Sequence, residues 1–368
     1  MNRRDALRWL AAGGIGLAAT QSERALAQED QRILGIETLP KVGPWPTDDP
    51  FLFCVHHHDR FPAGNEKLGP NTSLAGRRLG HDFSDRDGWS MYHGDTVPGF
   101  PRHPHRGFET ITVVQSGTID HADSLGAVAR YGDGDVQWLT AGDGINHAEM
   151  FPLLRDKAPN PIDFFQIWLN LPAQRKRVIP AFDMLWEPSI PQVKRLDAEG
   201  RLTTVRVIAG RYGDRVPPSP PKASYAAEGR ADFALWVIQL SPKAHWRLPA
   251  ASAEAGRSLY VTTGAGLRVH GEPIAPRSRV RLQPSSHCEI HNGAEPSQLL
   301  LLQARPLGEP VVKHGPFVMN SRAEIQQAFE DYRRTGFGGW PWREDGPVHG
   351  KKADRFAQWP DGRRETPT

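Results

Sequence analysis

Two pairs of side chains that can bind metal ions, each pair with one residue between its members, mark the first half of this sequence. His103 and His105 lie in the motif FPRHPHRGFE, and His147 and Glu149 lie in GINHAEM. Residues two apart in a β-strand point to the same side, so each pair would present two ligand atoms together. Three imidazoles and one carboxylate suit divalent iron, manganese, cobalt, nickel, copper or zinc, and octahedral binding would leave two positions for water or substrate. The spacing therefore predicts one metal ion of the catalytic type.

Glu109 is a second candidate for the carboxylate ligand. It lies an even number of residues from His103 and His105, so in a continuous strand all three side chains would point to the same side. Spacing alone therefore makes it an equal rival to Glu149. The segment 106–146 is long enough for several meandering strands, which would bring the second pair back beside the first inside a barrel. The residues by themselves leave the choice between the two glutamates open.

Short β-rich runs separated by glycine turns surround the two pairs and continue through the second half of the chain. They predict strands over residues 109–114, 118–120, 135–139, 202–209, 233–240, 258–262, 266–270 and 298–303. This pattern indicates two all-β units. Ser321 and Glu324 have capping-box spacing before residues 325–332, which predicts one helix that ends at Gly336.

Proline-bearing stretches over 180–197 and 211–222 indicate where the two units meet. We therefore expect a signal peptide over 1–27, an N-terminal barrel over 28–195, a C-terminal barrel over 196–310, a crossover segment with the helix over 311–340, and a loose charged tail over 341–368.

The other histidines have simpler structural interpretations. Three consecutive residues cannot all face one site, so we expect a loop near the barrel mouth at His56, His57 and His58, with a secondary metal site as the alternative. In the second half, His245, His287 and His291 lack the spacing of one residue between partners. His287 and Glu289 form only a lone pair around Cys288, so the second barrel is expected to be metal-free.

Composition narrows the function further. The formal net charge is +3, and no long basic tract interrupts the chain, which argues against a nucleic-acid partner. Cys54 and Cys288 are too few for a disulfide framework and are interpreted as small buried hydrophobes, although they could pair. Trp138 has the parity of Val136 and is expected to pack inside the barrel.

The N-terminus has the features of an export signal. Arg3 and Arg4 precede a weakly apolar run over 9–19, and Ala25-Leu26-Ala27 fits a cleavage site. The run is too short to span a bilayer. We expect twin-arginine export, no membrane span after signal removal, and a periplasmic or secreted protein; the alternative is an uncleaved amphipathic helix.

Four motifs together resemble the pirin family. They are GFPRHPHRGFET from Gly99, GDVQWLTAG from Gly134, GINHAEM from Gly144 and GPFVMN from Gly315, and the similarity runs from about residue 49 to about residue 339. The resemblance implies a bicupin, which is two cupin barrels in tandem, with a metal ion, commonly iron, held at His103, His105, His147 and Glu149. It thereby selects Glu149 over Glu109. The sequence departs from the family pattern at Arg102, Asn146 and Ala148, and Asn146 is expected to change the polarity of the pocket.

The resemblance also implies an activity. Pirins are similar to quercetin 2,3-dioxygenases, so the expected reaction is oxygen-dependent cleavage of a flavonol-like substrate, with Glu149 as the catalytic base and O2 as co-substrate. The alternative is a non-catalytic metal-binding redox sensor or interaction protein.

Overall fold

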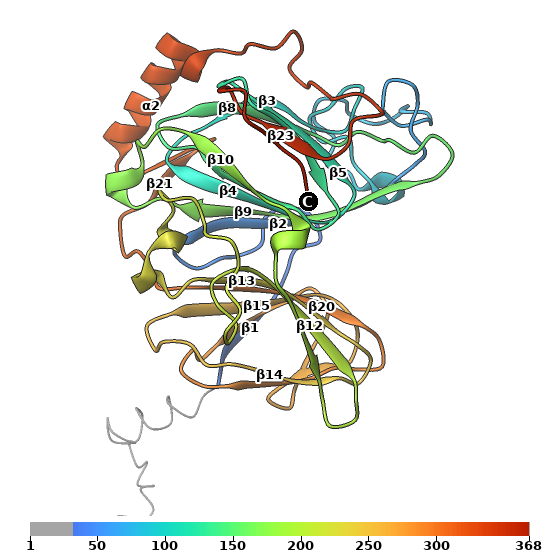
Figure 1. Ribbon diagram of the computed structural model, residues 1–368, viewed down its shortest axis with the longest axis vertical. Coiled ribbons are helices and arrows are strands. Elements are labelled where there is room, and N and C mark those ends of the chain that lie inside the picture. Colours follow the sequence, from blue (N-terminus) through green and yellow to red (C-terminus); the bar gives the residue numbers. More distant parts are fainter. Residues whose placement is uncertain (1–31, 368) are drawn as a thin grey trace, which may run out of the picture.

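The protein was studied as a computed structural model, which describes residues 32–367. Two β-barrels are stacked along the long axis, and helix α2 (Arg322–Thr335) lies beside the upper, N-terminal one (Figure 1). The bicupin fold expected from the sequence is therefore confirmed. The twin-arginine segment expected over 1–27 lies outside the described residues.

Two antiparallel sheets form the N-terminal barrel. The first has the order β10-β7-β4-β9-β2, which are Ala181–Leu185, Val136–Thr140, Phe108–Ser116, Asn160–Asn170 and Phe51–Phe61. The second has the order β24-β23-β6-β5-β8-β3, which are Arg364–Glu365, Phe356–Gln358, Val128–Gly132, Thr118–Asp123, Ile145–Met150 and Gly99–His105.

Two further sheets form the C-terminal barrel. The larger has the order β1-β18-β15-β20-β13-β12-β11, which are Ile33–Thr38, Ser278–Leu282, Gly256–Thr263, Ser297–Ala304, Ala234–Leu240, Leu202–Ala209 and Gln192–Leu196. The smaller has the order β14-β19-β16-β17, which are His245–Leu248, Cys288–His291, Leu267–Val269 and Glu272–Ile274. A separate hairpin, β21 (Val312–His314) and β22 (Phe317–Met319), leads into α2.

Short 3-10 turns connect these elements at Arg86–Gly88, Ala173–Arg175, Glu187–Ser189, Tyr225–Ala227, Gly229–Ala231 and Gly336–Gly338. The one α-helix of the described residues begins as predicted, because the Ser321 side chain accepts a hydrogen bond from the Glu324 amide, and it ends at Gly336 with φ of 54°. Within residues 32–367 we find no helix with the length and apolar character needed to cross a bilayer.

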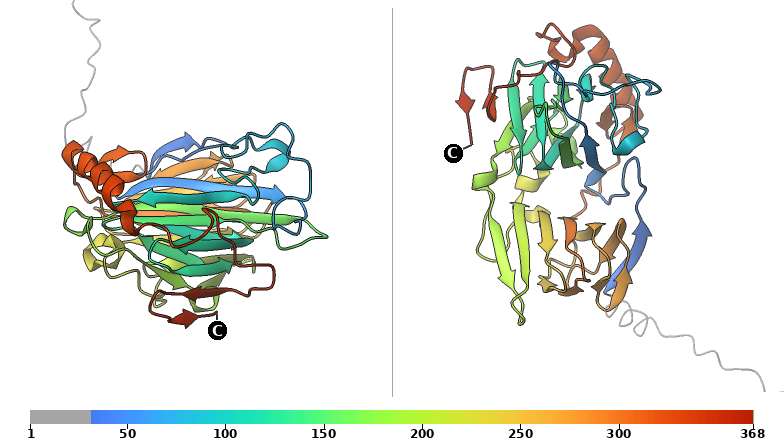
Figure 2. Two further views of the ribbon diagram at one scale, coloured as in Figure 1. Left: turned by 90° about the horizontal axis from the view of Figure 1, so that it is seen from above. Right: turned by 90° about the vertical axis from the view of Figure 1, so that its right-hand side faces the viewer.

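The first described strand pairs with the C-terminal barrel, and the last described strands pair with the N-terminal barrel (Figure 2). Strand β1 pairs with β18 of the C-terminal barrel, although residues 28–195 were expected to form the N-terminal one. At the other end, β23 pairs with β6 and extends the N-terminal barrel, so residues 341–367 do not form the loose tail that their charge and proline content suggested. Strand β11 also belongs to the C-terminal barrel, which moves the boundary to an earlier position than residue 195.

A shared apolar core joins the barrels. Ile111, Val113 and Trp138 of the first sheet pack with C-terminal residues that include Phe233 and Tyr260. Trp138 is thus buried as expected, but it lies between the barrels and not inside one. Cys54 belongs to this shared core and Cys288 to the core of the C-terminal barrel, and both are free thiols.

Candidate metal centre

Antiparallel pairing of β3 with β8 brings the two predicted pairs together. His103 of β3 lies directly across from His147 of β8. One ligand nitrogen from each of His103, His105 and His147 lies within 4.8 Å of the other two. The ring centroids are 4.4 Å apart for His103 and His147, and 5.0 Å apart for His105 and His147. We call these three residues the histidine triad.

The three imidazoles of the triad are neutral, and several of their ring nitrogens have no hydrogen-bond partner. Burial lowers the pKa of His103 to about 4 and the pKa values of His105 and His147 well below their ordinary value. Both ring nitrogens of His147 and Nδ1 of His105 are buried without a hydrogen-bond partner. Buried polar atoms are normally paired, so these unpaired nitrogens fit the role of metal ligands. A neutral imidazole is the form that binds a metal ion.

Glu149 lies beside the triad and is held by three neighbours. Its Oε1 accepts hydrogen bonds from the hydroxyls of Thr112 at 3.0 Å and Tyr131 at 3.3 Å, and its Oε2 accepts one from the Gln166 amide at 2.9 Å. Oε2 is 4.0 Å from Nε2 of His147. Burial raises the pKa of the carboxyl group, against the opposing effects of His121 and the hydrogen bonds.

Glu109 occupies the opposite face of its sheet. Its carboxylate accepts hydrogen bonds from Thr140 at 2.8 Å and from Ser224, in the loop between β12 and β13, at 2.6 Å. Its neighbours Ile111 and Val113, with the same parity, belong to the core between the barrels. Parity within the sequence did not reveal this, because the turn at 106–107 separates β3 from β4 and resets the direction of the side chains.

Glu109 should make the stability of the fold depend on pH. Burial raises its pKa to about 7, from an ordinary value of 4.5. A carboxyl group with a raised pKa binds its proton more tightly in the folded state, so its contribution to stability is present below pH 4.5 and is lost as the pH rises through 7. We expect Glu109→Gln to lose less stability than wild type between pH 5 and pH 8, by an amount on the order of 3 kcal/mol or less.

Urea unfolding at the two pH values measures this difference. Wild type and Glu109→Gln are compared at each pH, so the groups that titrate in both proteins cancel in the difference. An unchanged pH dependence in Glu109→Gln would contradict the assignment.

His121 is a fully buried side chain that the sequence analysis did not single out. It lies across from Glu149 in the pairing of β5 with β8, its ring centroid is 5.7 Å from that of His147, and its Nε2 is 3.2 Å from Asp123. The signal that could have found it is the spacing of His121 and Asp123, two residues apart directly after the predicted strand over 118–120, which the structure extends to Asp123. His121 therefore belongs to the polar lining of the site.

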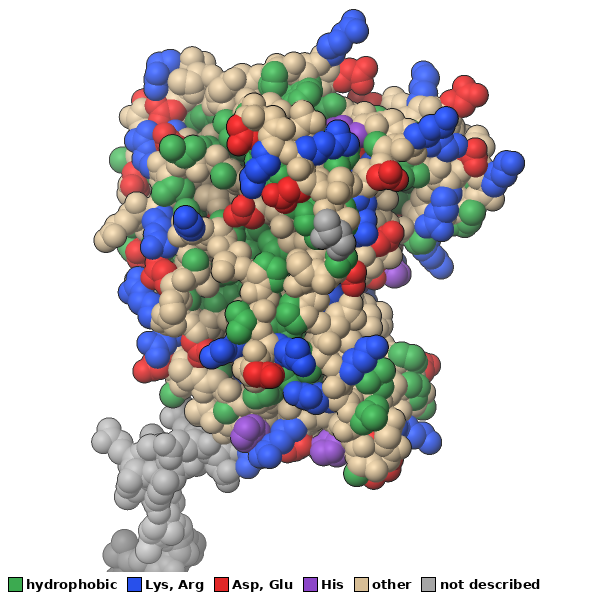
Figure 3. All heavy atoms as spheres, viewed as in Figure 1, with side chains coloured by type: hydrophobic (Ala, Val, Ile, Leu, Met, Phe, Trp, Pro, Cys, Tyr) green, Lys and Arg blue, Asp and Glu red, His purple; other side chains and the backbone are tan. Residues whose placement is uncertain are grey.

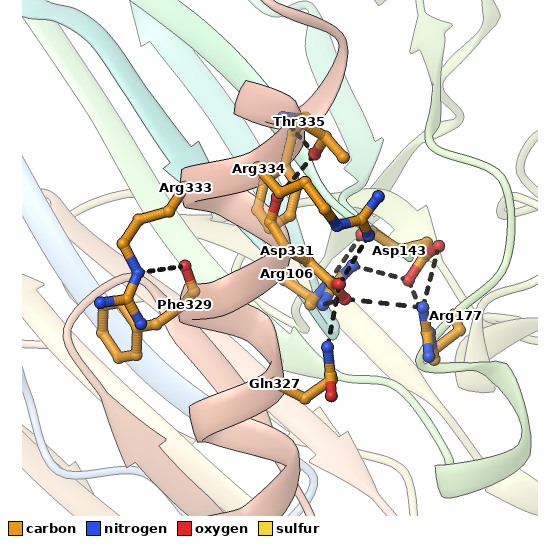
Figure 4. A network of polar contacts seen from close by, with 10 residues as sticks. Arg106, Asp143, Arg177, Gln327, Phe329, Asp331, Arg333, Arg334 and Thr335 are labelled. Atoms are coloured by element: carbon orange, nitrogen blue, oxygen red, sulfur yellow. Dashed lines mark hydrogen bonds and ion pairs between the residues drawn. The ribbon is translucent and has the colours of Figure 1, made fainter.

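The turn that follows His105 is fixed by a buried ion network (Figure 4). The guanidinium of Arg106 donates to Asp331 of α2 at 2.8 Å and to Asp143 at 2.9 Å, and its side chain is only 4% exposed. Arg334 and Gln327 of the same helix also donate to Asp331, each at 3.0 Å. Helix α2 thus anchors the residue next to a triad histidine, from more than 200 positions away in the chain.

Asp331→Asn should weaken this anchor. The variant keeps the shape of the side chain but leaves the buried Arg106 with Asp143 as its remaining charged partner, so we expect a loss of about 2 kcal/mol in unfolding free energy at pH 7. The hydrogen bond from Arg106 lowers the pKa of Asp331, against the effect of burial, so the contribution is present above pH 3.8 and is lost as the pH falls below that value. Urea unfolding measures the loss. The exposed neighbour Glu330→Gln is the control, and equal stability of both variants would show that the network is unimportant.

Two sequence departures from the pirin pattern have structural roles away from the triad. The Asn146 amide donates to the backbone carbonyls of Gly336 at 2.5 Å and Gly339 at 3.1 Å, so it holds the end of the helix and does not line the pocket as expected. The Arg102 backbone amide donates to the Asp345 carbonyl, and the two side chains form an ion pair at 3.2 Å. Both contacts attach the C-terminal segment to the strands of the site.

The other histidines that the sequence analysis considered lie in two places. His56, His57 and His58 lie within strand β2 and not in the loop that was expected. In the C-terminal barrel, His245 pairs with Glu289 at 2.7 Å and stacks on His291, while His287 is exposed.

Comparisons with known proteins agree with this architecture. Residues 49–169 match the family model described as Pirin, and residues 235–338 match the Pirin C-terminal cupin domain. The chain is 38% identical over 243 residues to a Pseudomonas aeruginosa protein named "Putative quercetin 2,3-dioxygenase", with 65% of this chain and 79% of that protein covered. It is 34% identical over 256 residues to a pirin-like protein of Caulobacter vibrioides, covering 70% and 85%.

Solved structures show the same fold. The crystal structure of quercetin 2,3-dioxygenase from Acinetobacter baumannii superposes with a TM-score of 0.64 at 24% identity, over 83% of this chain and 98% of that one. At this identity the likeness concerns the fold alone.

Proposed function

This chain belongs to the pirin family, and from that premise we propose that it is a metal-dependent dioxygenase of the quercetin 2,3-dioxygenase type. The observation that carries the proposal is the buried histidine triad with its unpaired ring nitrogens, beside a buried glutamate. Relatives named as quercetin 2,3-dioxygenases support the choice of a flavonol as substrate.

The residues fit a divalent metal ion, for which we propose Fe²⁺. His103, His105 and His147 would hold it, and Glu149 would be the fourth ligand. The carboxylate lies somewhat further out than the three histidines, with Oε2 4.0 Å from Nε2 of His147. When bound, such an ion lowers the pKa of a hydroxyl that binds to it and holds the substrate in place.

Glu149 is the residue that we propose as the general base. Its carboxylate would accept the proton of the flavonol 3-hydroxyl, and its pKa, raised by burial, makes it a stronger proton acceptor than an exposed glutamate. Thr112 and Tyr131 fix one oxygen and Gln166 the other, which limits the directions in which the carboxylate can turn. Deprotonation makes the flavonol ring electron-rich at the carbon that reacts with oxygen.

Aromatic side chains contact two members of the triad and make its surroundings largely apolar. Trp168 and Phe108 contact His105, with ring centroids 5.2 and 5.0 Å away, and Phe100 lies 6.3 Å from His103. Both atoms of O2 are incorporated into the product as the heterocyclic ring opens, and carbon monoxide leaves, so the reaction needs no external reductant. A water-poor site protects the reactive anion from protonation.

Oxygen consumption with quercetin tests the proposal. The chain from residue 28 to 368 is purified, its metals are quantified, and each candidate ion is restored separately. Many turnovers per metal ion would establish the dioxygenase. One bound ion at the triad without turnover would instead favour the redox sensor or interaction protein.

We also propose that the protein is exported to the periplasm or secreted through the twin-arginine route. The proposal rests on the sequence of residues 1–27, and Arg3→Lys with Arg4→Lys should abolish export in a fractionated cell if it is correct. Export that persists in this variant would contradict it.

A further inference from the structure

A second group of metal-binding side chains lies on strand β2 and its neighbour β9. His56 and His58 are two residues apart and share one face of β2, and Asp163 of β9 lies directly across from His58. Nε2 of His56 is 2.8 Å from Oδ1 of Asp163, and Nδ1 of His58 is 3.3 Å from Oδ2. One ligand atom from each residue lies within 4.8 Å of the other two.

The sheet separates this group from the histidine triad. His57, between the two histidines, points to the other face, where its Nδ1 is 2.9 Å from the Tyr92 hydroxyl and its ring stacks on Phe164 in the core of the N-terminal barrel. His56 stacks instead on Phe165, which belongs to the core between the barrels. His56 and His58 therefore face the side of β2 opposite to His57.

The three side chains are held in place and remain accessible. The ring of His56 lies between Phe165, at 4.6 Å, and Trp45, at 5.6 Å, and its side chain is only 12% exposed. The side chain of Asp163 is 16% exposed and that of His58 is 61% exposed. Burial opposes ionisation of Asp163, but its hydrogen bonds with His56 and His58 lower its pKa to about 2, so it is a carboxylate at neutral pH.

A cleft of about 700 Å³ opens beside this group. Its walls come from β2, from the segment 40–45 and from the C-terminal barrel, where Thr262 and Arg277 line it. Figure 3 shows the molecular outline indented between the two barrels on the right of the view. The open side of this group faces the cleft, so a water molecule or another small ligand can reach the three side chains from there.

We propose that His56, His58 and Asp163 bind a second divalent transition-metal ion at this cleft, with zinc as the ion that the ligand set fits best. Two imidazoles and one carboxylate with a fourth position open to water are a common zinc ligand set. The hydrogen bonds that now link both histidines to one carboxylate show that the three groups already converge without a cation. Binding replaces those bonds with bonds to the ion. This site is independent of the proposed dioxygenase activity.

Zinc binding to the metal-stripped chain, followed by calorimetry, tests the site. The wild type should bind two equivalents, His58→Ala one, His103→Ala one, and the double variant none. His58 is mostly exposed, so its replacement should leave the unfolding midpoint of the metal-free chain unchanged. His287→Ala, which removes an exposed histidine of the C-terminal barrel, should still bind two equivalents.

The outcomes separate this site from the triad. If His103→Ala binds no zinc, or if His58→Ala still binds two equivalents, the second site is overturned. Loss of oxygen consumption in His103→Ala but not in His58→Ala supports both proposals. An absence of turnover in the wild type, with the expected zinc equivalents bound by the wild type and by each variant, would remove the proposed function and leave the second site standing.

Discussion

His103→Ala is expected to lose its metal ion at the triad and, with it, at least about 100-fold of the oxygen consumed with quercetin. Replacing residues that only support a metal ligand typically lowers affinity or activity 10–100-fold, so removal of a ligand itself should cost more. His103 is the triad member with the greatest exposure, and its Nδ1 contacts only the Pro101 carbonyl, so the fold should tolerate the change best at this position.

Metal content and turnover are measured on the same preparation of His103→Ala. His93→Ala is the matched control, because the ring of His93 lies 5.8 Å from that of Phe100, which also neighbours His103, but His93 is not part of the triad. Full activity in His103→Ala, or equal loss in His93→Ala, would show that the triad is not the reactive centre.

Glu149→Gln is expected to lower kcat by about 100-fold to 10,000-fold, the usual contribution of a general base. The amide keeps the size of the side chain but cannot accept the proton of the substrate. Because the three histidines remain, we expect the metal content to fall much less than the turnover. A flavonol that is already ionised at high pH should recover part of the lost rate, which a purely structural role of Glu149 would not produce.

Glu109→Gln is the control for this variant, since both glutamates are buried and only Glu149 adjoins the triad. Turnover in Glu109→Gln should equal that of wild type at pH 6. If Glu109→Gln instead lost metal and turnover while Glu149→Gln kept both, the assignment of the carboxylate would be wrong.

The sequence by itself determined the local features of this protein. Alternating apolar residues and glycine turns indicated eight of the strands that the structure describes. Ser321, Glu324 and Gly336 indicated the helix and both of its ends, because these signals act between neighbouring residues. The spacing within each pair, His103 with His105 and His147 with Glu149, was also visible, since a strand fixes the direction of alternate side chains.

Only the tertiary structure decided which distant residues meet. Strand β1 pairs with the C-terminal barrel and β23 with the N-terminal barrel. Glu109 points away from the triad, and the buried His121 lies beside the triad. The tertiary structure also sets His58 across from Asp163, 105 residues further along the chain. Such contacts follow from how strands pair across a sheet, and pairing between strands far apart in sequence leaves no periodic signal within either strand.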